Sequence, residues 1–142
     1  MADDGGSDFA RSMSIATSGL RAQAGRMRVI SENIANADST APTSAGDPYR
    51  RKVPTFTSAL DRSIDARVVT LGKVRTDQSP FRIKHEPSNP AADAAGNVKY
   101  PNVNPLVEMT DIREAQRSYE ANLNIISATR RMIQRTLDIL KA

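Results

Sequence analysis

The sequence predicts a mainly α-helical fold, in which long N- and C-terminal helices pair as an antiparallel coiled coil with a small β-containing segment between them. Two observations carry this prediction: a heptad series at each end of the chain, and short β-branched stretches between the two series. We therefore divide the chain into a disordered lead (residues 1–8), a helical domain built from residues 9–37 and 103–141, and a loop and β insert (residues 38–102).

The C-terminal heptad series runs from Tyr119 to Leu140. Its members recur at alternating steps of four and three residues, with Arg130 at one turn. This repeat keeps one apolar seam on one side of a helix. Acidic residues dominate the first half and basic residues the end, which suits the partial charges of the helix termini. A helix of roughly 35 residues would be about 50 Å long, so we expect it to pack on something extended.

The N-terminal series runs from Phe9 to Ile34 with the same alternation, and it predicts a second long amphipathic helix. Gly19 and Gly25 lie inside it, and each costs roughly 1 kcal/mol relative to Ala. They are either tolerated weak points or sites where helices approach closely. The segment Asn36–Pro48 contains turn residues, Gly and Pro, and it ends this helix.

The middle segment contains short stretches rich in β-branched and aromatic residues. They predict strands of a small sheet or of hairpins at residues 51–56, 66–71 and 80–85. Pro54 in the first of them favours an edge or a bulge. Val98–Pro101 is a short extended piece that leads to Pro105, a suitable first-turn residue of the last helix.

Composition excludes several classes of function. The chain has no cysteine, which rules out disulfides, thiol catalysis and Cys-based zinc sites. A net charge of +4 and a pI near 9.8 are compatible with nucleic-acid binding, but the only compact basic cluster is Arg50–Lys52, so we do not expect it. There is no eighteen-residue apolar run that predicts a membrane span. The acidic N-terminus has no apolar signal region, so we expect no cleavable signal peptide.

Residues for catalysis are scarce. His85 is the only histidine, and no cysteine or paired carboxylate lies near it in the sequence. Asp61 and Asp65 have the spacing of a metal-binding pair, but Arg62 and Arg67 flank them and favour a solvated face. Metalloprotease, P-loop and dinucleotide-binding motifs are absent from the sequence. We expect no enzyme activity, no cofactor and no metal.

Five motifs resemble one family. Ser31–Asp38 (Ser-Glu-Asn-Ile-Ala-Asn-Ala-Asp) and Arg117–Asn122 (Arg-Ser-Tyr-Glu-Ala-Asn) resemble signatures of the bacterial flagellar axial proteins, the rod and hook families. Glu86–Pro90 and Asp93–Val103 are similar to a run in the proximal-rod branch, and Asp47–Arg50 fits its turn after the first helix. These motifs stand in the family's order, and the resemblance covers nearly the whole chain.

The sequence departs from the family's motifs at two polar or turn positions. Glu32 stands where an Asn is frequent, and Asn97 stands where an aromatic residue is usual. The resemblance implies a structural subunit of the proximal rod of the bacterial flagellar basal body, which assembles helically and transmits motor torque to hook and filament. It implies a periplasmic location, and as partners further copies of the chain, other rod proteins (FlgB, FlgF, FlgG and FliE) and the flagellar type III export apparatus. The alternatives are another rod protein of the family or a generic coiled-coil assembly adaptor.

The candidate functional residues are those of an assembly interface, since an exposed apolar stripe marks an interaction surface. The expected apolar interface residues are Leu20, Met27, Ile30, Ile34, Tyr119, Leu123, Ile126, Ile133 and Leu137. We expect Asn33, Asn36 and Asn122 to fix helix ends and register, with a helix cap or a solvated amide as the alternative, above all for Asn36. The resemblance further implies that the terminal helices are largely disordered before assembly, and seams completed only by neighbours agree with this.

Overall fold

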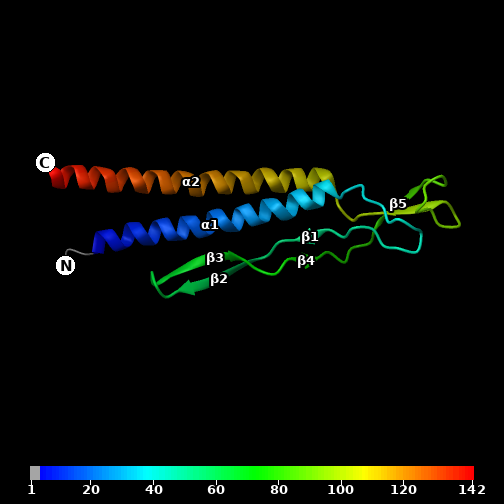
Figure 1. Ribbon diagram of the computed structural model, residues 1–142, viewed down its shortest axis with the longest axis horizontal. Helices are drawn as coiled ribbons and strands as arrows, with labels where there is room; N and C mark the ends of the chain where they lie inside the picture. Colours follow the sequence, from blue (N-terminus) through cyan, green and yellow to red (C-terminus); the bar gives the residue numbers. More distant parts are fainter. Residues whose placement is uncertain (1–3) are drawn as a thin grey trace. The chain divides into compact units, whose positions relative to one another are not determined.

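The computed structural model describes residues 4–142 as two long helices, with short strands between them in the order of the chain (Figure 1). The elements are α1 (Asp4–Ala35), β1 (Lys52–Val53), β2 (Phe56–Asp61), β3 (Ala66–Leu71), β4 (Arg75–Thr76), β5 (Arg82–His85), β6 (Asn97–Tyr100) and α2 (Pro105–Lys141). The predicted mainly α-helical architecture, with a small β-containing middle, is confirmed.

The helix ends differ slightly from the prediction. α1 includes residues 4–8, which the sequence analysis assigns to a disordered lead; residues 1–3 lie outside the described part of the chain. Acidic residues favour the first turns of a helix, and Asp8 also forms a 3.3 Å ion pair with Arg11. α2 begins at Pro105 because Asn104 caps it: the Asn104 Oδ1 accepts a 3.1 Å hydrogen bond from the Leu106 N–H.

The strands form three separate antiparallel pairs, β1–β4, β2–β3 and β5–β6. The predicted strand at residues 66–71 is β3, and the predicted strand at 80–85 contains β5. The predicted strand at 51–56 is divided at Pro54, which cannot donate a ladder hydrogen bond, so β1 ends before it and β2 starts after it.

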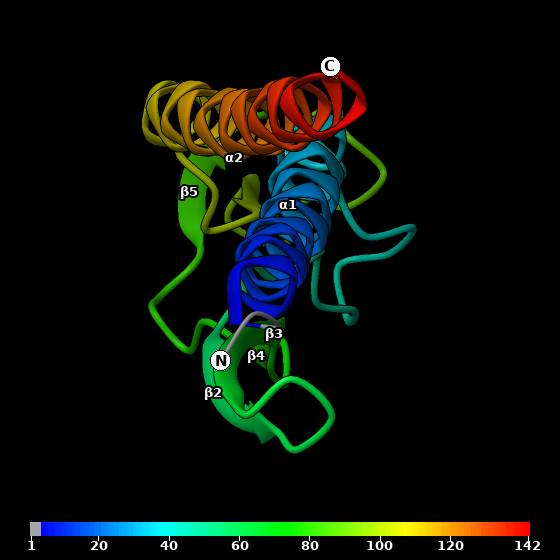
Figure 2. The same cartoon turned by 90° about the vertical axis from the view of Figure 1, so that its left-hand side faces the viewer.

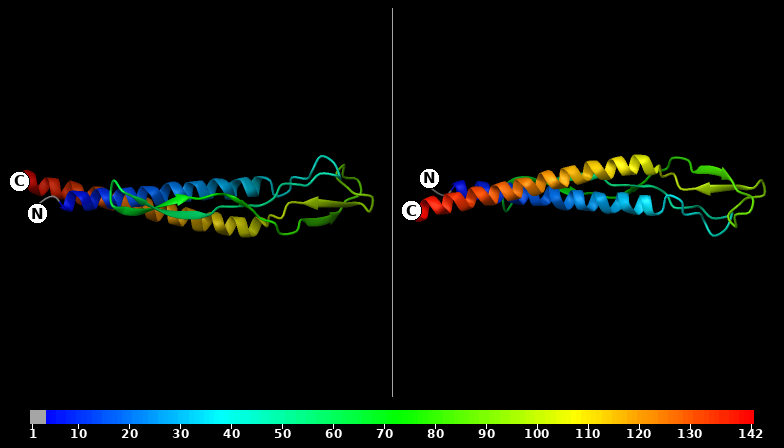
Figure 3. Two further views of the ribbon diagram at one scale, coloured as in Figure 1. Left: turned by 90° about the horizontal axis from the view of Figure 1, so that it is seen from below. Right: turned by 90° about the horizontal axis from the view of Figure 1, so that it is seen from above.

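The chain divides into two compact units. Among the described residues, the first unit comprises residues 4–26, 55–73 and 114–142. Within this unit the first part of α1 lies between α2 and the β2–β3 hairpin (Figure 2), and Figure 3 shows the two helices from two further sides. The hairpin is tied to α1 by a 2.7 Å hydrogen bond from Arg11 Nε to the Ile64 carbonyl, and by one of 3.3 Å from the Val69 N–H to Ser18 Oγ.

The second unit comprises residues 27–54 and 74–113, and it holds the β1–β4 and β5–β6 pairs with the adjoining helix ends. Its small apolar core is built from Ala91, Val98 and Tyr100, and Val103 is also fully buried. Arg82 joins two segments here. Its guanidinium donates to the Ala37 carbonyl (2.7 Å) just after α1 and to the Pro101 carbonyl (2.9 Å) just after β6.

Candidate functional site

A buried network of polar side chains joins four segments of the second unit. We call it the polar junction and define it as Asn33, Tyr49, Arg51, Asn102 and Glu108. These residues come from the end of α1, the extended chain before β1, the loop after β6 and the first turn of α2. Asn33 and Glu108 are both fully buried.

Asn33 uses its whole hydrogen-bonding capacity. Its Nδ2 donates to the Lys52 carbonyl (2.8 Å) and to Glu108 Oε2 (3.1 Å). Its Oδ1 accepts from the Tyr49 hydroxyl (2.8 Å) and from the Lys52 N–H (2.9 Å). A buried amide with all partners present specifies one geometry, because each partner left unpaired would cost free energy.

Glu108 carries a negative charge into this buried position, and Arg51 compensates it. Arg51 Nε donates to Glu108 Oε1, while its other nitrogens lie 3.7 Å from Asp77 Oδ2 and 3.6 Å from Asp111 Oδ2. One guanidinium therefore faces three carboxylates, which suits the planar fork of arginine better than a lysine ammonium. The Arg51 N–H also donates to Asn102 Oδ1 (2.8 Å).

Two titratable groups beside these contacts have shifted pKa values. Burial, followed by the negative charges of Glu32 and Glu108, raises the pKa of Tyr49 to about 12. The neutral phenol is therefore the form that donates to Asn33. Hydrogen bonds from the Ser79 backbone and hydroxyl hold the pKa of Asp77 below its ordinary value, with Arg51 adding to the effect.

The basic cluster Arg50–Lys52 is used inside the second unit. Arg50 stacks over the Phe81 ring at 4.1 Å, and Lys52 Nζ donates to Glu32. With Arg51 in the polar junction, all three basic side chains have partners within this unit.

The residues buried between α1 and α2 in the first unit have small side chains. Ala16 on α1 and Ala115 and Thr129 on α2 are buried. Residues early in α1 lie against residues late in α2: Gly6, Phe9, Ala10 and Met13 line a groove with Ile133, Thr136, Leu137 and Leu140. Toward the C-terminal part of α1, Arg26 forms a 3.6 Å ion pair with Glu114, near the start of α2.

The two glycines of α1 are sites of close approach, to a helix as the sequence suggested at Gly19 but to a β-hairpin at Gly25. A β-carbon at Gly19 would lie 2.9 Å from Asn122 Oδ1, and one at Gly25 would lie 2.8 Å from Leu71 Cδ2. The missing side chain at Gly19 therefore lets α2 approach closely, and the missing side chain at Gly25 does the same for the β2–β3 hairpin.

The predicted interface residues fall into three groups. Ile30 and Asn33 are buried. Partly buried are Leu20, Met27, Ile34, Asn36, Tyr119, Asn122, Ile126 and Ile133. Leu123 and Leu137 are 46% and 45% exposed, so the chain itself leaves much of them open. Asn36 and Asn122 each donate to the carbonyl four residues before them (both 2.9 Å).

Sequence reasoning missed Glu108, Arg51 and Tyr49. Glu108 was assigned only to the acidic half of α2. A signal for its burial was present, because Glu108, Ala115, Asn122 and Thr129 are spaced by seven residues and form one row of the helix. The side chains of this row are small or polar, so a search for large apolar residues does not find it.

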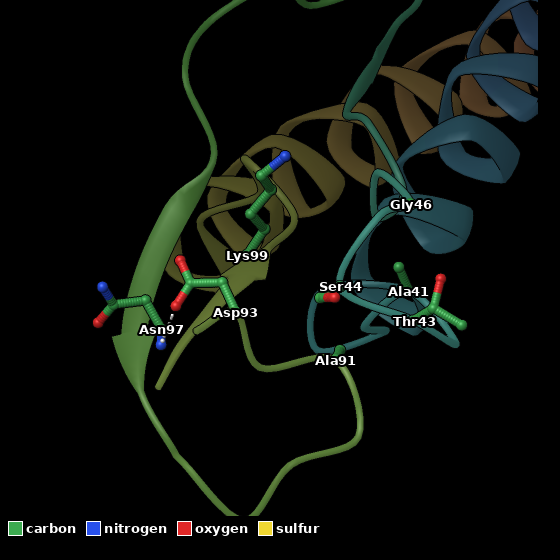
Figure 4. Close-up of a pocket in the computed structure, with 8 residues that line it drawn as sticks. All are labelled: Ala41, Thr43, Ser44, Gly46, Ala91, Asp93, Asn97 and Lys99. Atoms are coloured by element: carbon green, nitrogen blue, oxygen red, sulfur yellow. Dashed lines mark hydrogen bonds between the residues drawn. The ribbon is translucent and has the colours of Figure 1, made fainter. Parts of the chain in front are cut away.

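A cavity of about 20 Å³ lies in the second unit between the loop Ala41–Gly46 and the segment 91–99 (Figure 4). The Asn97 N–H donates to Asp93 Oδ1 (2.9 Å) at its edge. This volume holds about one water molecule, and ligand pockets are many times larger. Among residues 4–142 there is no group of three or more His, Cys, Asp or Glu placed to hold a metal, and no helix long and apolar enough to span a membrane.

Comparisons with known proteins identify the family. The family described as "Flagella basal body rod protein" matches residues 13–41, and "Flagellar basal body rod FlgEFG protein C-terminal" matches residues 94–139. The chain is 52% identical to the flagellar basal-body rod protein FlgC of Agrobacterium fabrum, over 90% of this chain and 92% of that protein. It is 40% identical to FlgC of Salmonella typhimurium (88% and 92%) and 37% identical to FlgC of Bacillus subtilis (92% and 97%). The chain therefore belongs to the FlgC family of flagellar basal-body rod proteins.

Proposed function

We propose that this chain builds the proximal rod by pairing α1 and α2 as an antiparallel coiled coil, whose outward apolar residues contact neighbouring subunits. As a member of the FlgC family, the chain is a structural subunit of the flagellar basal-body rod. The observation that carries the proposal is the opposite order of the contacts along the two helices: Phe9 lies near Leu140, whereas Arg26 pairs with Glu114.

In this proposal residues 9–37 and 103–141 form the rod-core domain, and residues 38–102 form an insert that the polar junction holds to it. The predicted interface residues then divide between contacts within the chain and contacts between chains. We assign Leu123 and Leu137 to contacts between chains, because about half of each side chain is exposed. Many such contacts in parallel would transmit torque through the rod without any catalytic step.

The partners that we propose are further copies of the chain, the rod proteins FlgB, FlgF, FlgG and FliE, and the flagellar type III export apparatus. The proposed location is the periplasmic part of the basal body. An α1–α2 contact whose fully buried residues are small (Ala16, Ala115 and Thr129) supports passage through an export gate as an unfolded chain, because a helix pair with little apolar burial has little stability to lose.

The test is the variant Leu123→Asp in a bacterium that has this chain as its only copy of the rod protein. A carboxylate at an apolar contact is strongly unfavourable when buried by a neighbour, so we expect no rod incorporation and no motility. The matched control is Asn124→Asp on the adjacent exposed position, which should leave the strain motile. A motile Leu123→Asp strain would contradict the interface assignment.

A further inference from the structure

The outer strand β2 of the β2–β3 hairpin has backbone groups that point away from its partner strand. In an antiparallel pair, every second residue directs its N–H and C=O outward. The Gly72 N–H donates to the Thr55 carbonyl (2.7 Å), so these two residues form a hydrogen-bonded pair next to the ladder. The alternation along β2 then turns the backbone groups of Phe56, Ser58 and Leu60 outward.

Only one edge of this hairpin is used within the first unit. β3 is the strand nearer to α1 (Figure 1, Figure 2), and its Val69 N–H donates to Ser18 Oγ (3.3 Å) on that helix. The outward groups of β2 have no hydrogen-bond partner within residues 4–142. Phe56 and Leu60 are also 43% and 56% exposed. An edge strand with free backbone groups and exposed apolar side chains is a template for a further strand.

The β5–β6 hairpin of the second unit has a free edge of the same kind. The Glu86 N–H donates to the Gly96 carbonyl (2.8 Å), so the alternation turns the groups of Ile83 outward on β5 and those of Asn97 outward on β6. Asp93 occupies the β6 edge, because it exchanges two 2.9 Å hydrogen bonds with the Asn97 N–H and carbonyl. On β5 the outward groups have no partner within residues 4–142, and Ile83 is 59% exposed.

The two free edges complement each other in apolar surface and in charge. In one antiparallel register Leu60 of β2 lies opposite Ile83 of β5, which pairs the most exposed apolar side chains of the two hairpins. The same register brings Asp61 diagonally beside Lys84, within reach of an ion pair. Asp61 is the only charged residue of β2, whereas β5 carries Arg82 and Lys84. Pairing of either strand with its own counterpart would bring like charges together.

From these two edges we infer that β2 of one copy pairs antiparallel with β5 of a second copy of this chain, which joins the two hairpins into one sheet across two chains. Backbone hydrogen bonds supply the contact, and the alternate side chains fix its register. The inference rests on the proposed function and names a contact between subunits outside the helices. Because the two edges differ, the contact is heterologous, and each pair of copies keeps one free edge of each kind for further copies.

The absence of native cysteine makes disulfide cross-linking a direct test. In the proposed register Ala59 lies opposite Lys84 as a pair without mutual hydrogen bonds, at a Cα separation of about 4.5 Å, which suits a disulfide. The variants Ala59→Cys, Lys84→Cys and the double variant each serve as the only copy of this rod protein in a motile bacterium. Purified basal bodies are oxidised with copper phenanthroline and separated without reductant. We expect multimers from the double variant, dimers only from the two single variants co-expressed, and monomers from each single variant alone.

The matched control combines Thr70→Cys with Lys84→Cys and should give no multimers. Thr70 lies on the same face of the hairpin as Thr57, since the two hydroxyls are 2.8 Å apart, but it lies one strand farther from the free edge. A second pair, Ser58→Cys with His85→Cys, tests the same register at a neighbouring position. The inference would be overturned if both pairs stayed monomeric in basal bodies of motile cells. Efficient dimers from one single variant would also overturn it, because one edge would then meet itself.

A backbone variant separates strand pairing from mere proximity. Ser58→Pro, added to the Ala59→Cys and Lys84→Cys variant, removes the outward N–H but no hydrogen bond to β3, since proline is tolerated on an edge strand. We expect it to abolish the multimers, while Ser58→Ala in the same background keeps them. Multimers that survive Ser58→Pro would contradict strand pairing. The proposed function fails separately, if the unsubstituted chain is absent from purified basal bodies.

Discussion

Asn33 Nδ2 donates a 3.1 Å hydrogen bond to Glu108 Oε2 although the two residues are 75 positions apart, and both side chains are fully buried. The contact joins the last turn of α1 to the first turn of α2 within the second unit. It gives a physical role to the asparagine in the Ser31–Asp38 motif: this amide holds four groups from three segments in one arrangement.

Replacing Asn33 by Ala should destabilise the chain strongly. The change leaves the Tyr49 hydroxyl, the Lys52 backbone groups and one Glu108 oxygen without their partner, and each buried unpaired group costs about 1–3 kcal/mol. We expect a loss of roughly 3 kcal/mol or more in the free energy of unfolding, measured by urea titration with circular dichroism. Asn124→Ala on the exposed side of α2 is the control and should change the stability by less than about 0.5 kcal/mol. Equal losses of stability in Asn33→Ala and Asn124→Ala would contradict the stabilising role of the Asn33 hydrogen bonds.

The Arg51–Glu108 pair should behave as a buried ion pair. Arg51→Met leaves the Glu108 carboxylate buried without its cation, which costs about 3–5 kcal/mol. The double variant Arg51→Met with Glu108→Leu removes the unpaired charge and should recover part of this loss. Lys52→Met is the control: its ion pair with Glu32 is partly exposed, so the expected loss is about 0–1 kcal/mol. A double variant less stable than the sum of the single changes would contradict this account.

The glycines of α1 should respond differently to Ala. At Gly19 the whole Asn122 amide lies within 3.1 Å of the new β-carbon, so the clash should outweigh the gain in helix propensity of roughly 1 kcal/mol. At Gly25 the nearest atom is the end of the Leu71 side chain, which can rotate, so the loss should be smaller. Gly6→Ala meets nothing within 4 Å and serves as the control that gains stability. The unfolding temperatures of the three variants rank their stabilities. A higher unfolding temperature for Gly19→Ala than for Gly6→Ala would contradict the close approach at Gly19.

Stability should fall at high pH through Tyr49. Its pKa is raised from 10.0 to about 12 in the folded chain, so the folded state favours the neutral phenol. This contribution is fully present below about pH 10, the unfolded pKa, and is lost as the pH rises through about 12. Near-ultraviolet absorbance should show a late-ionising component that is reduced in Tyr49→Phe. The late component that remains belongs to Tyr100, because its hydrogen bond to Glu86 also raises its pKa. A Tyr49 that ionises near pH 10 in the folded chain would disprove the shift.

The sequence was sufficient to predict both long helices and the strand at residues 66–71, because heptad steps and β-branched runs are local signals. It did not predict the partner of β5, since Val98–Tyr100 reads only as extended until Arg82 is placed opposite Tyr100. It also placed the large apolar residues of α2 in one seam. Late members of that seam, Ile133, Leu137 and Leu140, do line the groove with α1. Beside Gly19, which lets the helices approach closely, the residues of α2 are Ala115, Asn122 and Thr129.

The polar junction could not be predicted for a similar reason. Glu108 and Arg51 each have ordinary surface roles in a sequence, as a residue of a helix first turn and as part of a basic run. The seven-residue row marks Glu108 as a candidate for burial, but its pairing with Arg51 joins segments 57 positions apart, which no local pattern encodes.

We propose that the outward residues of α2 find their partners only on assembly. Hydrogen exchange followed by mass spectrometry tests it directly, on the purified chain and on the same chain in isolated basal bodies. We expect residues 27–54 and 74–113 to be protected in both samples, because the polar junction and the core around Val98 lie within that unit. We expect residues 114–141 to exchange rapidly in the free chain and slowly in the rod. Equally slow exchange of residues 114–141 in both samples would contradict the account, because the two helices would then complete each other without neighbours.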